Sequence, residues 1–334
     1  MTPSRGGNPM KHAMMLSTVA MLALAATGAE AQTTLRLACP SAADNPTCLA
    51  ANRFAEEAGA LSGGSLDIQV FPAGQLGRGA EAIQQTQAGI IDLVVEDITN
   101  YANFVNDYNI ISWGFTFRDQ DHFKAFLESD IETRLETQLR EQYNLRFLSV
   151  EWAKLPRVVV STKPVFTPED LKGLKFRVPG IPSYIKTWET LGTNPTSVPW
   201  GEAFQALKTG VTDAMESPLD SIVAQKFHLA APYVTLTNHV FPSITLAINE
   251  TKFQKLSADE QSALVEAASR AAGYSAELAT QTEQTAAKKI TDDGGFVISV
   301  NSAPFRKMLA AKASEQEADG LWSAGLMDEI QAIK

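Results

Sequence analysis

The chain has 334 residues, of which 45% are hydrophobic and 20% are charged, with 28 Lys and Arg against 38 Asp and Glu and a net charge of −10. This composition excludes a disordered or collagen-like chain, and the acidic balance argues against nucleic acid or an anionic membrane surface as a partner, because both attract basic patches. The length corresponds to about two domains of roughly 100–200 residues each.

The first thirty residues have the three parts of a secretory signal peptide. Lys11 precedes an apolar run at positions 13–26, and the A-x-A site at positions 29–31 follows it. The run is about 14 residues long, shorter than the roughly 20 that a membrane span needs, and no later segment is apolar enough to span a membrane. We expect cleavage after about Ala31, a mature chain that begins at Gln32, and export to the periplasm.

The two cysteines, Cys39 and Cys48, lie near the start of the mature chain. In an oxidising compartment a disulfide between them persists and closes a loop of about ten residues. Two small buried thiols are the alternative that the sequence leaves open. The cysteine and histidine spacings match no structural zinc site, so we predict none.

Short β-branched or apolar runs alternate with amphipathic stretches over most of the mature chain. In chain order, the predicted strands are 35–39, 66–71, 90–95, 145–150, 158–161, 174–178, 244–248 and 296–300. The predicted helices are 50–60, 80–88, 119–143, 184–191, 202–208, about 257–291 and about 303–313. This alternation predicts an α/β fold with largely parallel sheets flanked by helices.

The predicted helix that begins at residue 257 is unusually long. Ser257 and Glu260 form a capping box at its start, and no proline follows before about Thr291. Roughly 33 residues at 1.5 Å each reach about 50 Å, which is longer than a small domain is wide. We therefore expect this helix to run along two domains that exchange strands through several crossings.

The segment Gly77–Ala82 matches the dinucleotide-binding pattern G-x-G-x-x-G/A, and Asp97 lies twenty residues after Gly77. The context differs from that of a dinucleotide site, because five residues separate the preceding strand from the first glycine and an exported protein has no regular supply of NAD. We interpret the glycines as a turn before a helix. No serine-nucleophile or phosphate-loop motif is present, so the sequence predicts neither a cofactor nor an enzyme.

The predicted strand at 174–178 has the most informative polar pattern. Its alternation places the apolar residues on one face and Lys175 and Arg177 on the other. Pro179 ends the strand, so Arg177 lies near its carboxyl end, where open α/β sheets bind ligands. A guanidinium at that place can hold a carboxylate through two hydrogen bonds, and a surface ion pair is the alternative.

Several segments of the mature chain form an ordered set of motifs. They are Phe71–Gly77 (FPAGQLG), Gln87–Asp92 (QAGIID), Asp170–Pro179 (DLKGLKFRVP), Asn194–Thr196 (NPT), Gly210–Pro218 (GVTDAMESP) and Thr237–His239 (TNH). Their order and spacing resemble the solute-binding proteins of TRAP (tripartite ATP-independent periplasmic) transporters, the DctP-like family. The resemblance implies a two-lobed fold of the periplasmic-binding-protein type, with a long helix spanning both lobes. We expect lobe I to comprise residues 32–154 and 243–282, and lobe II residues 155–242 and 283–334.

The resemblance also implies a function and a site. A protein of this family captures a small organic-acid anion in the cleft between its lobes and delivers it to the small and large membrane subunits of a transporter. The family's carboxylate-binding arginine falls on Arg177, and a second arginine falls on Arg157. The other implied ligand contacts are Trp200, Glu216 and Ser217 in lobe II, and Glu96, Asp97 and Trp152 in lobe I.

Several of these assignments have alternatives. Trp200 is also suited to packing at a helix N-terminus, Ser217 to capping the helix after it, and Glu216 to pairing with either arginine in an empty cleft. Leu155 stands where the family has glycine, which shifts Arg157 relative to the ligand. The aromatic residues and this leucine favour a small hydroxy or keto monocarboxylate or a modest dicarboxylate over a large sugar acid.

Two other functional classes remain open. A sensory binding protein that feeds a membrane receptor would share the fold and the cleft. An exported hydrolase or lyase would build its site from carboxylates such as Glu96, Asp97 and Glu216.

Overall fold

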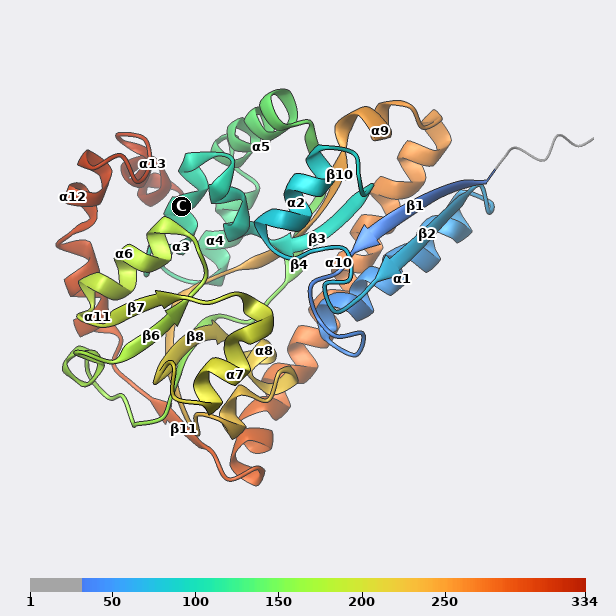
Figure 1. The fold of residues 1–334 in the computed structure, drawn as a ribbon. Coiled ribbons are helices and arrows are strands. Elements are labelled where there is room, and N and C mark those ends of the chain that lie inside the picture. Colours follow the sequence, from blue (N-terminus) through green and yellow to red (C-terminus); the bar gives the residue numbers. More distant parts are fainter. Residues whose placement is uncertain (1–31) are drawn as a thin grey trace, which may run out of the picture. The chain divides into compact units, whose positions relative to one another are not determined.

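The computed structural model describes residues 32–334, which form one unit, whereas the predicted signal peptide lies outside the described residues. Two mixed sheets form the core of this unit (Figure 1). We call the first sheet and the helices on it lobe I, and the second sheet and its helices lobe II. The predicted two-lobed α/β fold is confirmed.

The strands of the first sheet, from edge to edge, are Leu66–Phe71 (β2), Thr33–Ala38 (β1), Leu93–Asp97 (β3), Ser243–Asn249 (β10) and Leu145–Ala153 (β4). Strand β1 pairs in parallel with β2 and β3, and β10 pairs antiparallel with β3 and β4. Strand β10 therefore lies between the parallel half of this sheet and β4. It begins about ninety residues after the end of β4 in the chain.

The strands of the second sheet, from edge to edge, are Phe296–Ser299 (β11), Tyr233–Val240 (β9), Arg157–Ser161 (β5), Ala214–Pro218 (β8), Lys175–Val178 (β6) and Asn194–Ser197 (β7). Strand β5 runs antiparallel to both β9 and β8, and β6 runs parallel to β8 and β7. Strands β7, β8 and β9 were not predicted.

Helices cover both sheets. In chain order they are Pro46–Leu61 (α1), Ala80–Gln87 (α2), Asn109–Ser112 (α3), Gln120–Leu127 (α4), Asp130–Tyr143 (α5), Pro182–Thr190 (α6), Ala203–Lys208 (α7), Leu219–Ala224 (α8), Glu250–Gln254 (α9), Ala258–Asp292 (α10), Ala303–Ala310 (α11), Ala313–Ala318 (α12) and Leu326–Ala332 (α13). Short 3-10 helices occupy Ile98–Asn103, Asn106–Tyr108, Pro168–Leu171, Trp200–Glu202 and Phe227–Leu229. The segment 119–143, predicted as one helix, forms two helices, α4 and α5. The break lies at Ser129, whose side chain accepts the Ile131 amide and caps the N-terminus of α5.

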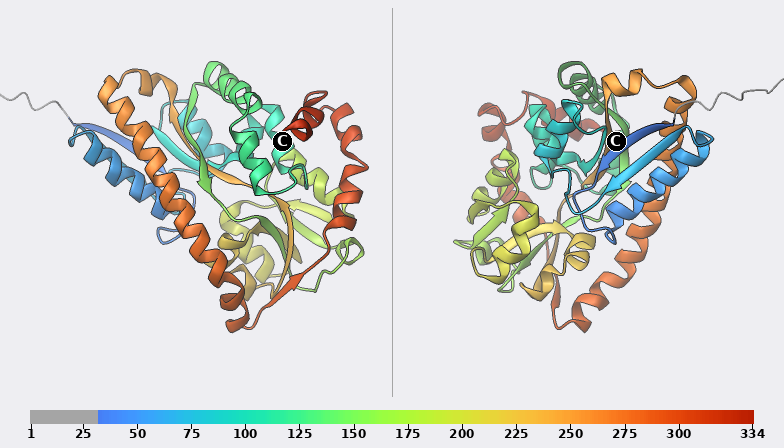
Figure 2. Two further views of the ribbon diagram at one scale, coloured as in Figure 1. Left: turned by 180° about the vertical axis from the view of Figure 1, so that it is seen from behind. Right: turned by 45° about the vertical axis from the view of Figure 1, so that its right-hand side comes forward.

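Helix α10 runs alongside both lobes for its 35 residues (Figures 1 and 2). Ser257 and Glu260 form the predicted capping box. Its first half contributes small residues such as Ala267 and Ala271 to the core under the first sheet, which lets α1 and β4 approach closely. Near its end, Ile290 belongs to the core under the second sheet. The expectation that this helix spans both lobes is therefore met.

The last residues of the chain contact lobe I. The guanidinium of Arg118 donates to the carbonyl of Ile333 at 2.7 Å, and Arg134 pairs with Glu329 at 2.7 Å. Trp322 packs against Trp113, with their ring centroids 5.8 Å apart. The predicted boundaries had assigned residues 283–334 to lobe II.

Candidate ligand-binding cleft

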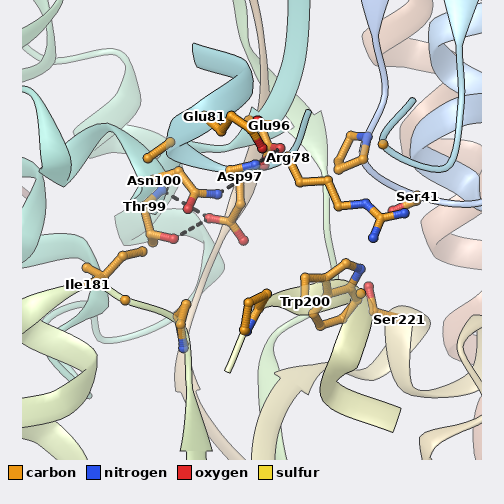
Figure 3. Close-up of a pocket in the computed structure, with 18 of the residues that line it drawn as sticks. Ser41, Arg78, Glu81, Glu96, Asp97, Thr99, Asn100, Ile181, Trp200 and Ser221 are labelled. Carbon is orange, nitrogen blue, oxygen red and sulfur yellow. Dashed lines mark hydrogen bonds between the residues drawn. The ribbon is translucent and has the colours of Figure 1, made fainter. Parts of the chain in front are cut away.

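A cavity of about 730 Å³ lies between the two lobes (Figure 3). One wall comes from lobe I, from the chain after β1, the turn before α2 and the end of β3. The other comes from lobe II, from the ends of β6 and β8 and the segment after β7. Most of the strands that reach the cavity have their carboxyl ends there. In α/β sheets, ligands bind at the carboxyl ends of the strands.

Arg177 lies in β6, whose neighbours Phe176 and Val178 are buried in the core. The Arg177 side chain is 2% exposed and lines the cavity, and its Nε donates to the Val198 carbonyl at 2.9 Å. No carboxylate within residues 32–334 lies within 4 Å of this guanidinium. Burial lowers the pKa of Arg177 to about 10, with Glu216 opposing and Arg157 adding to the effect, so the group remains a cation at neutral pH.

Arg157, the first residue of β5, also lines the cavity but has carboxylate partners. Its guanidinium holds both oxygens of Glu216, with Nη2 at 2.8 Å from Oε1, and its Nη1 lies 2.9 Å from Oδ2 of Asp97. Asp97 comes from lobe I and Glu216 from lobe II, so this ion pair joins the lobes. Burial opposes the charge of Arg157, but the attraction of Glu216 outweighs it and raises the pKa of the arginine.

Glu216 is fully buried behind Arg157 and does not line the cavity. Burial disfavours its ionised form, but the charge and hydrogen bonds of Arg157, together with His239 at 3.7 Å, outweigh burial and lower the pKa of Glu216 to about 2. Glu216 is therefore an anion that compensates Arg157 from behind the cavity wall.

Glu96 lies at the end of β3 on the opposite wall. It is 4% exposed, its Oε1 accepts from the Gly79 amide at 2.5 Å, and its Oε2 accepts from Asn100 at 3.0 Å. Burial raises the pKa of Glu96 to about 7, and the neighbouring Asp97 adds to this effect while the hydrogen bonds oppose it. This carboxyl group is thus close to half protonated at neutral pH.

The structure brings Arg177, Arg157, Trp200, Asp97 and Glu96 together around the cavity. Trp200 is half-buried, with its ring 5.7 Å from Cζ of Arg177 on one side and 5.2 Å from the Phe227 ring on the other. It is the first residue of the 3-10 helix Trp200–Glu202, packs against the 3-10 helix Phe227–Leu229, and also lines the cavity.

Ser217 and Trp152 do not line the cavity. Ser217 belongs to β8, and its buried hydroxyl has no hydrogen-bond partner within the described residues, so it caps no helix. Trp152 was expected in the cleft, but it lies in the core under the first sheet, 6.4 Å from the Phe54 ring, and its Nε1 donates to the Ala268 carbonyl at 3.1 Å. The reason is the direction of alternation along β4, which points this side chain toward α10.

A family model for the bacterial extracellular solute-binding proteins, family 7 (DctP), matches residues 38–319. The chain belongs to this family. Its members include the solute-binding proteins of TRAP transporters, so the family suggested by the ordered motifs is the one found.

The relatives of this DctP-family protein agree with that assignment. A solute-binding protein of Roseobacter denitrificans is 31% identical over 85% of this chain and 87% of its own length. The 2,3-diketo-L-gulonate-binding periplasmic protein of Escherichia coli is 30% identical over 84% of this chain and 85% of its own. The crystal structure of a TRAP periplasmic solute-binding protein of Bordetella bronchiseptica, with density assigned to pantoate, superimposes with a TM-score of 0.84 at 28% identity, covering 91% of this chain and all of the other.

Two cations of the cavity were not predicted. Lys154 follows β4 and is buried, with Nζ 2.9 Å from Oδ2 of Asp220 and 2.8 Å from the Ser221 hydroxyl. Arg78 lies in the glycine-rich turn that resembles a dinucleotide motif, and it points into the cavity (Figure 3). The signal for Arg78 was present in the sequence, because a charged residue in a turn after a strand of an α/β fold lies at the ligand-binding edge.

Cys39 and Cys48 form a disulfide, with their Cα atoms 5.9 Å apart. The loop that they close contributes Ser41 and Thr47 to the cavity wall. The Ser41 carbonyl accepts the Ala73 amide, so this loop is tied to the turn that leads to Arg78.

Within residues 32–334 we find no cluster of three or more His, Cys, Asp or Glu side chains arranged to hold a metal ion. No helix in this part of the chain combines the length and apolar character that crossing a membrane requires.

Proposed function

We propose that this DctP-family protein captures a small organic-acid anion in the cleft and delivers it to the membrane subunits of a TRAP transporter. The observation that carries the proposal is Arg177, a buried cation that faces the cavity with no carboxylate partner in the described structure. A buried charge of this kind is costly unless something pairs with it, and a ligand carboxylate would supply the pair. The named ligands of the relatives, pantoate and 2,3-diketo-L-gulonate, are organic acids.

The energetics are consistent with a transport protein. A charge-assisted hydrogen bond contributes about 1.5–3 kcal/mol, and a micromolar site needs about 8 kcal/mol in total. Arg177 would therefore supply a large share of the affinity, and contacts around the cavity would supply the rest.

Arg157 would have a different role. Three of its five N–H groups already bond to Glu216 and Asp97, so its charge is compensated and two N–H groups remain for a ligand. We infer that Arg157 orients the ligand by hydrogen bonding, while Arg177 provides the uncompensated charge. Trp200 would pack against the ligand body, and Glu96 would contact it from lobe I.

Binding would close the cleft about a hinge. The chain passes between the lobes at residues 153–157, at residues 240–243 and along α10. A ligand that touches both walls favours the closed arrangement, because it gains its full contacts only there. We retain the predicted boundaries of the two lobes as part of this proposal, except that residues 322–333, assigned to lobe II, pack against lobe I.

The protein would act in the periplasm after removal of residues 1–31, and it would bind its ligand without transforming it. The relatives are solute-binding proteins, which supports binding without catalysis. A sensory binding protein for a membrane receptor remains the second candidate, since it would use the same cleft.

A thermal-shift screen against organic acids, sugars and amino acids tests the proposal. A ligand at about 100 times its dissociation constant adds about 2.7 kcal/mol to stability, which a melting curve detects. We expect stabilisation by one or a few organic acids in the wild type and much less in Arg177→Ala. Stabilisation only by neutral sugars, or equal stabilisation of both proteins, would contradict the proposal. If NMR shows that the protein converts the bound acid into another compound, the protein is an enzyme instead.

A further inference from the structure

The two lobes make a contact that does not depend on the chain crossings between them. Helix α3, which follows β3 in lobe I, packs against α6 of lobe II. The hydroxyl groups of Ser112 in α3 and Ser183 in α6 form a hydrogen bond, and the Asn109 side-chain oxygen accepts the Ser183 amide at 3.2 Å. All three side chains are buried. Because separation would leave these polar groups without their partners, the contact is costly to open.

The loop after α3 extends this contact. The Gly114 amide donates to the Thr187 hydroxyl of α6 at 3.3 Å, and the Phe115 amide donates to the His239 carbonyl of β9 at 2.6 Å. A Cβ at Gly114 would lie 2.7 Å from Cδ1 of Leu309 in α11, so a larger residue could not approach α11 so closely. The loop therefore contacts three elements outside lobe I.

Phe115 has a backbone conformation that large side chains rarely adopt. Its φ is +64°, in the left-handed region. Such strain persists only where the surrounding structure over-determines the backbone. Here the amide is bonded to His239, and Cζ of Arg306 lies 5.2 Å from the centre of the Phe115 ring. The strain indicates that the contact between the lobes is tightly fixed at this loop.

The C-terminal segment connects the lobes beside the same contact. After β11 in lobe II, the chain returns toward lobe I through α11, α12 and α13 (Figures 1 and 2). Helix α11 packs against α6, and Trp322 packs against Trp113, the residue directly after α3. Nε2 of His122 lies 2.9 Å from the Ile330 carbonyl. The segment therefore reinforces the α3–α6 contact with a covalent link.

On the other side of the cavity the lobes touch in a different way. Arg78 reaches from the turn before α2 to Gly201, where a Cβ would overlap with Nη1 of the arginine. Arg78 is half-buried and Gly201 is exposed, so water can replace this contact when it opens. Figure 3 shows Ile181, which directly precedes α6, on one side of the cavity and Arg78 with Trp200 on the other.

We propose that the α3–α6 contact, the loop after α3 and the C-terminal segment form a fixed pivot, and that the lobes part on the side of Arg78 and Gly201. This inference deepens the proposed function and rests on it, because the ligand drives the closure. It gives the closure a direction. The ligand enters between Arg78 and Gly201, while the side of the cavity at Ile181 stays shut.

A disulfide across the pivot tests this inference. Because the two hydroxyl groups are in contact, the double variant Ser112→Cys, Ser183→Cys should form a disulfide on oxidation. By calorimetry, the cross-linked protein should bind the acid that the screen identifies within about threefold of the wild-type affinity. Small-angle X-ray scattering should show the same contraction on binding as in the wild type. The two single variants, which cannot form this cross-link, are the matched controls.

Three outcomes of this experiment would overturn the inference. The cross-linked protein could lose the affinity that the single variants retain, or it could bind the acid without contracting. The cysteine pair could also fail to cross-link in the folded protein, which would show that the two helices are not held together.

Hydrogen exchange of the wild type provides an independent measurement that needs no variant. The amides of Gly114, Phe115 and Ser183 bond across the pivot, so they should be equally protected with and without the ligand. The amides near Gly79 and Gly201 should gain protection on binding. Rapid exchange of the pivot amides without ligand would overturn the inference. If these amides are protected but no acid binds, the proposed function fails and the pivot stands.

Discussion

At the residue scale, the side chain of Glu96 couples the cleft to pH. Burial raises its pKa to about 7, so it is mostly neutral at pH 6 and mostly ionised at pH 8. An ionised carboxylate on the cavity wall repels an anionic ligand, whereas the neutral acid can donate a hydrogen bond to it. Ligand binding should therefore favour the protonated form of Glu96.

We expect the affinity for an organic acid to fall by about threefold to tenfold between pH 6 and pH 8, with proton uptake on binding. Glu96→Gln, which stays neutral, should bind with nearly constant affinity over this range. Calorimetry in two buffers of different ionisation enthalpy measures both effects. An unchanged pH dependence in the glutamine variant would assign the effect to another group.

Glu216 has the opposite shift, and this affects stability. Because its folded pKa of about 2 lies below the ordinary 4.5, the stabilisation that it provides is present above pH 4.5 and is lost as the pH falls toward 2. Glu216→Gln leaves Arg157 with Asp97 alone and should lower the free energy of unfolding by about 3–5 kcal/mol at pH 7. The difference between the two proteins should shrink at pH 3. Denaturant titrations at both pH values measure it, and an equal difference at both would contradict this account.

At the element scale, the sequence predicted elements that have a strong pattern of their own. Strand β2 begins and ends where predicted, and α10 begins at the predicted capping box. Strands β7 and β8 contain proline and polar residues, and neither has an apolar alternation that could be recognised. They are strands because β6 lies between them and supplies hydrogen bonds from residues far away in the chain.

The residues of the candidate site also divide into those that the sequence could identify and those that it could not. Arg177 could be found because a strand pattern and a following proline place it at a strand end, and the ordered motifs identified it independently. Lys154 could not be assigned to the cleft from local pattern, because only the folded chain places it beside Asp220. Arg78 had a local signal, its place in a turn after a strand, but only the folded chain places it beside Gly201. Trp152 was misplaced for the same reason, since which face of β4 meets α10 depends on the packing of the two lobes.

The loop between Cys39 and Cys48 links the disulfide to the cavity. Closing about ten residues restricts the unfolded chain by roughly 2.5–3 kcal/mol in the chain-entropy account. We expect the double variant Cys39→Ala, Cys48→Ala to lose about that much stability by denaturant unfolding, with a weaker effect on ligand affinity. A wild-type protein whose stability does not change on reduction would contradict this expectation.

At the scale of the whole described unit, α10 and two short crossings connect the lobes, and the Asp97–Arg157 ion pair joins them across the cleft. A ligand held by both lobes should stabilise a closed arrangement. We expect the radius of gyration from small-angle X-ray scattering to fall when the ligand saturates the protein. Arg177→Ala at the same ligand concentration should show little change, and an equal response in both would show that closure does not depend on this contact.

The most direct test of the account is the affinity of Arg177 variants for the acid that the screen identifies. Arg177→Ala should bind it about tenfold to a few hundredfold more weakly than the wild type, because an anion in the cleft loses its uncompensated cation. Arg177→Lys should also bind more weakly, since an ammonium cannot reproduce the two parallel hydrogen bonds of a guanidinium. Calorimetric titration of the three proteins decides the matter, and wild-type affinity in both variants would contradict the account.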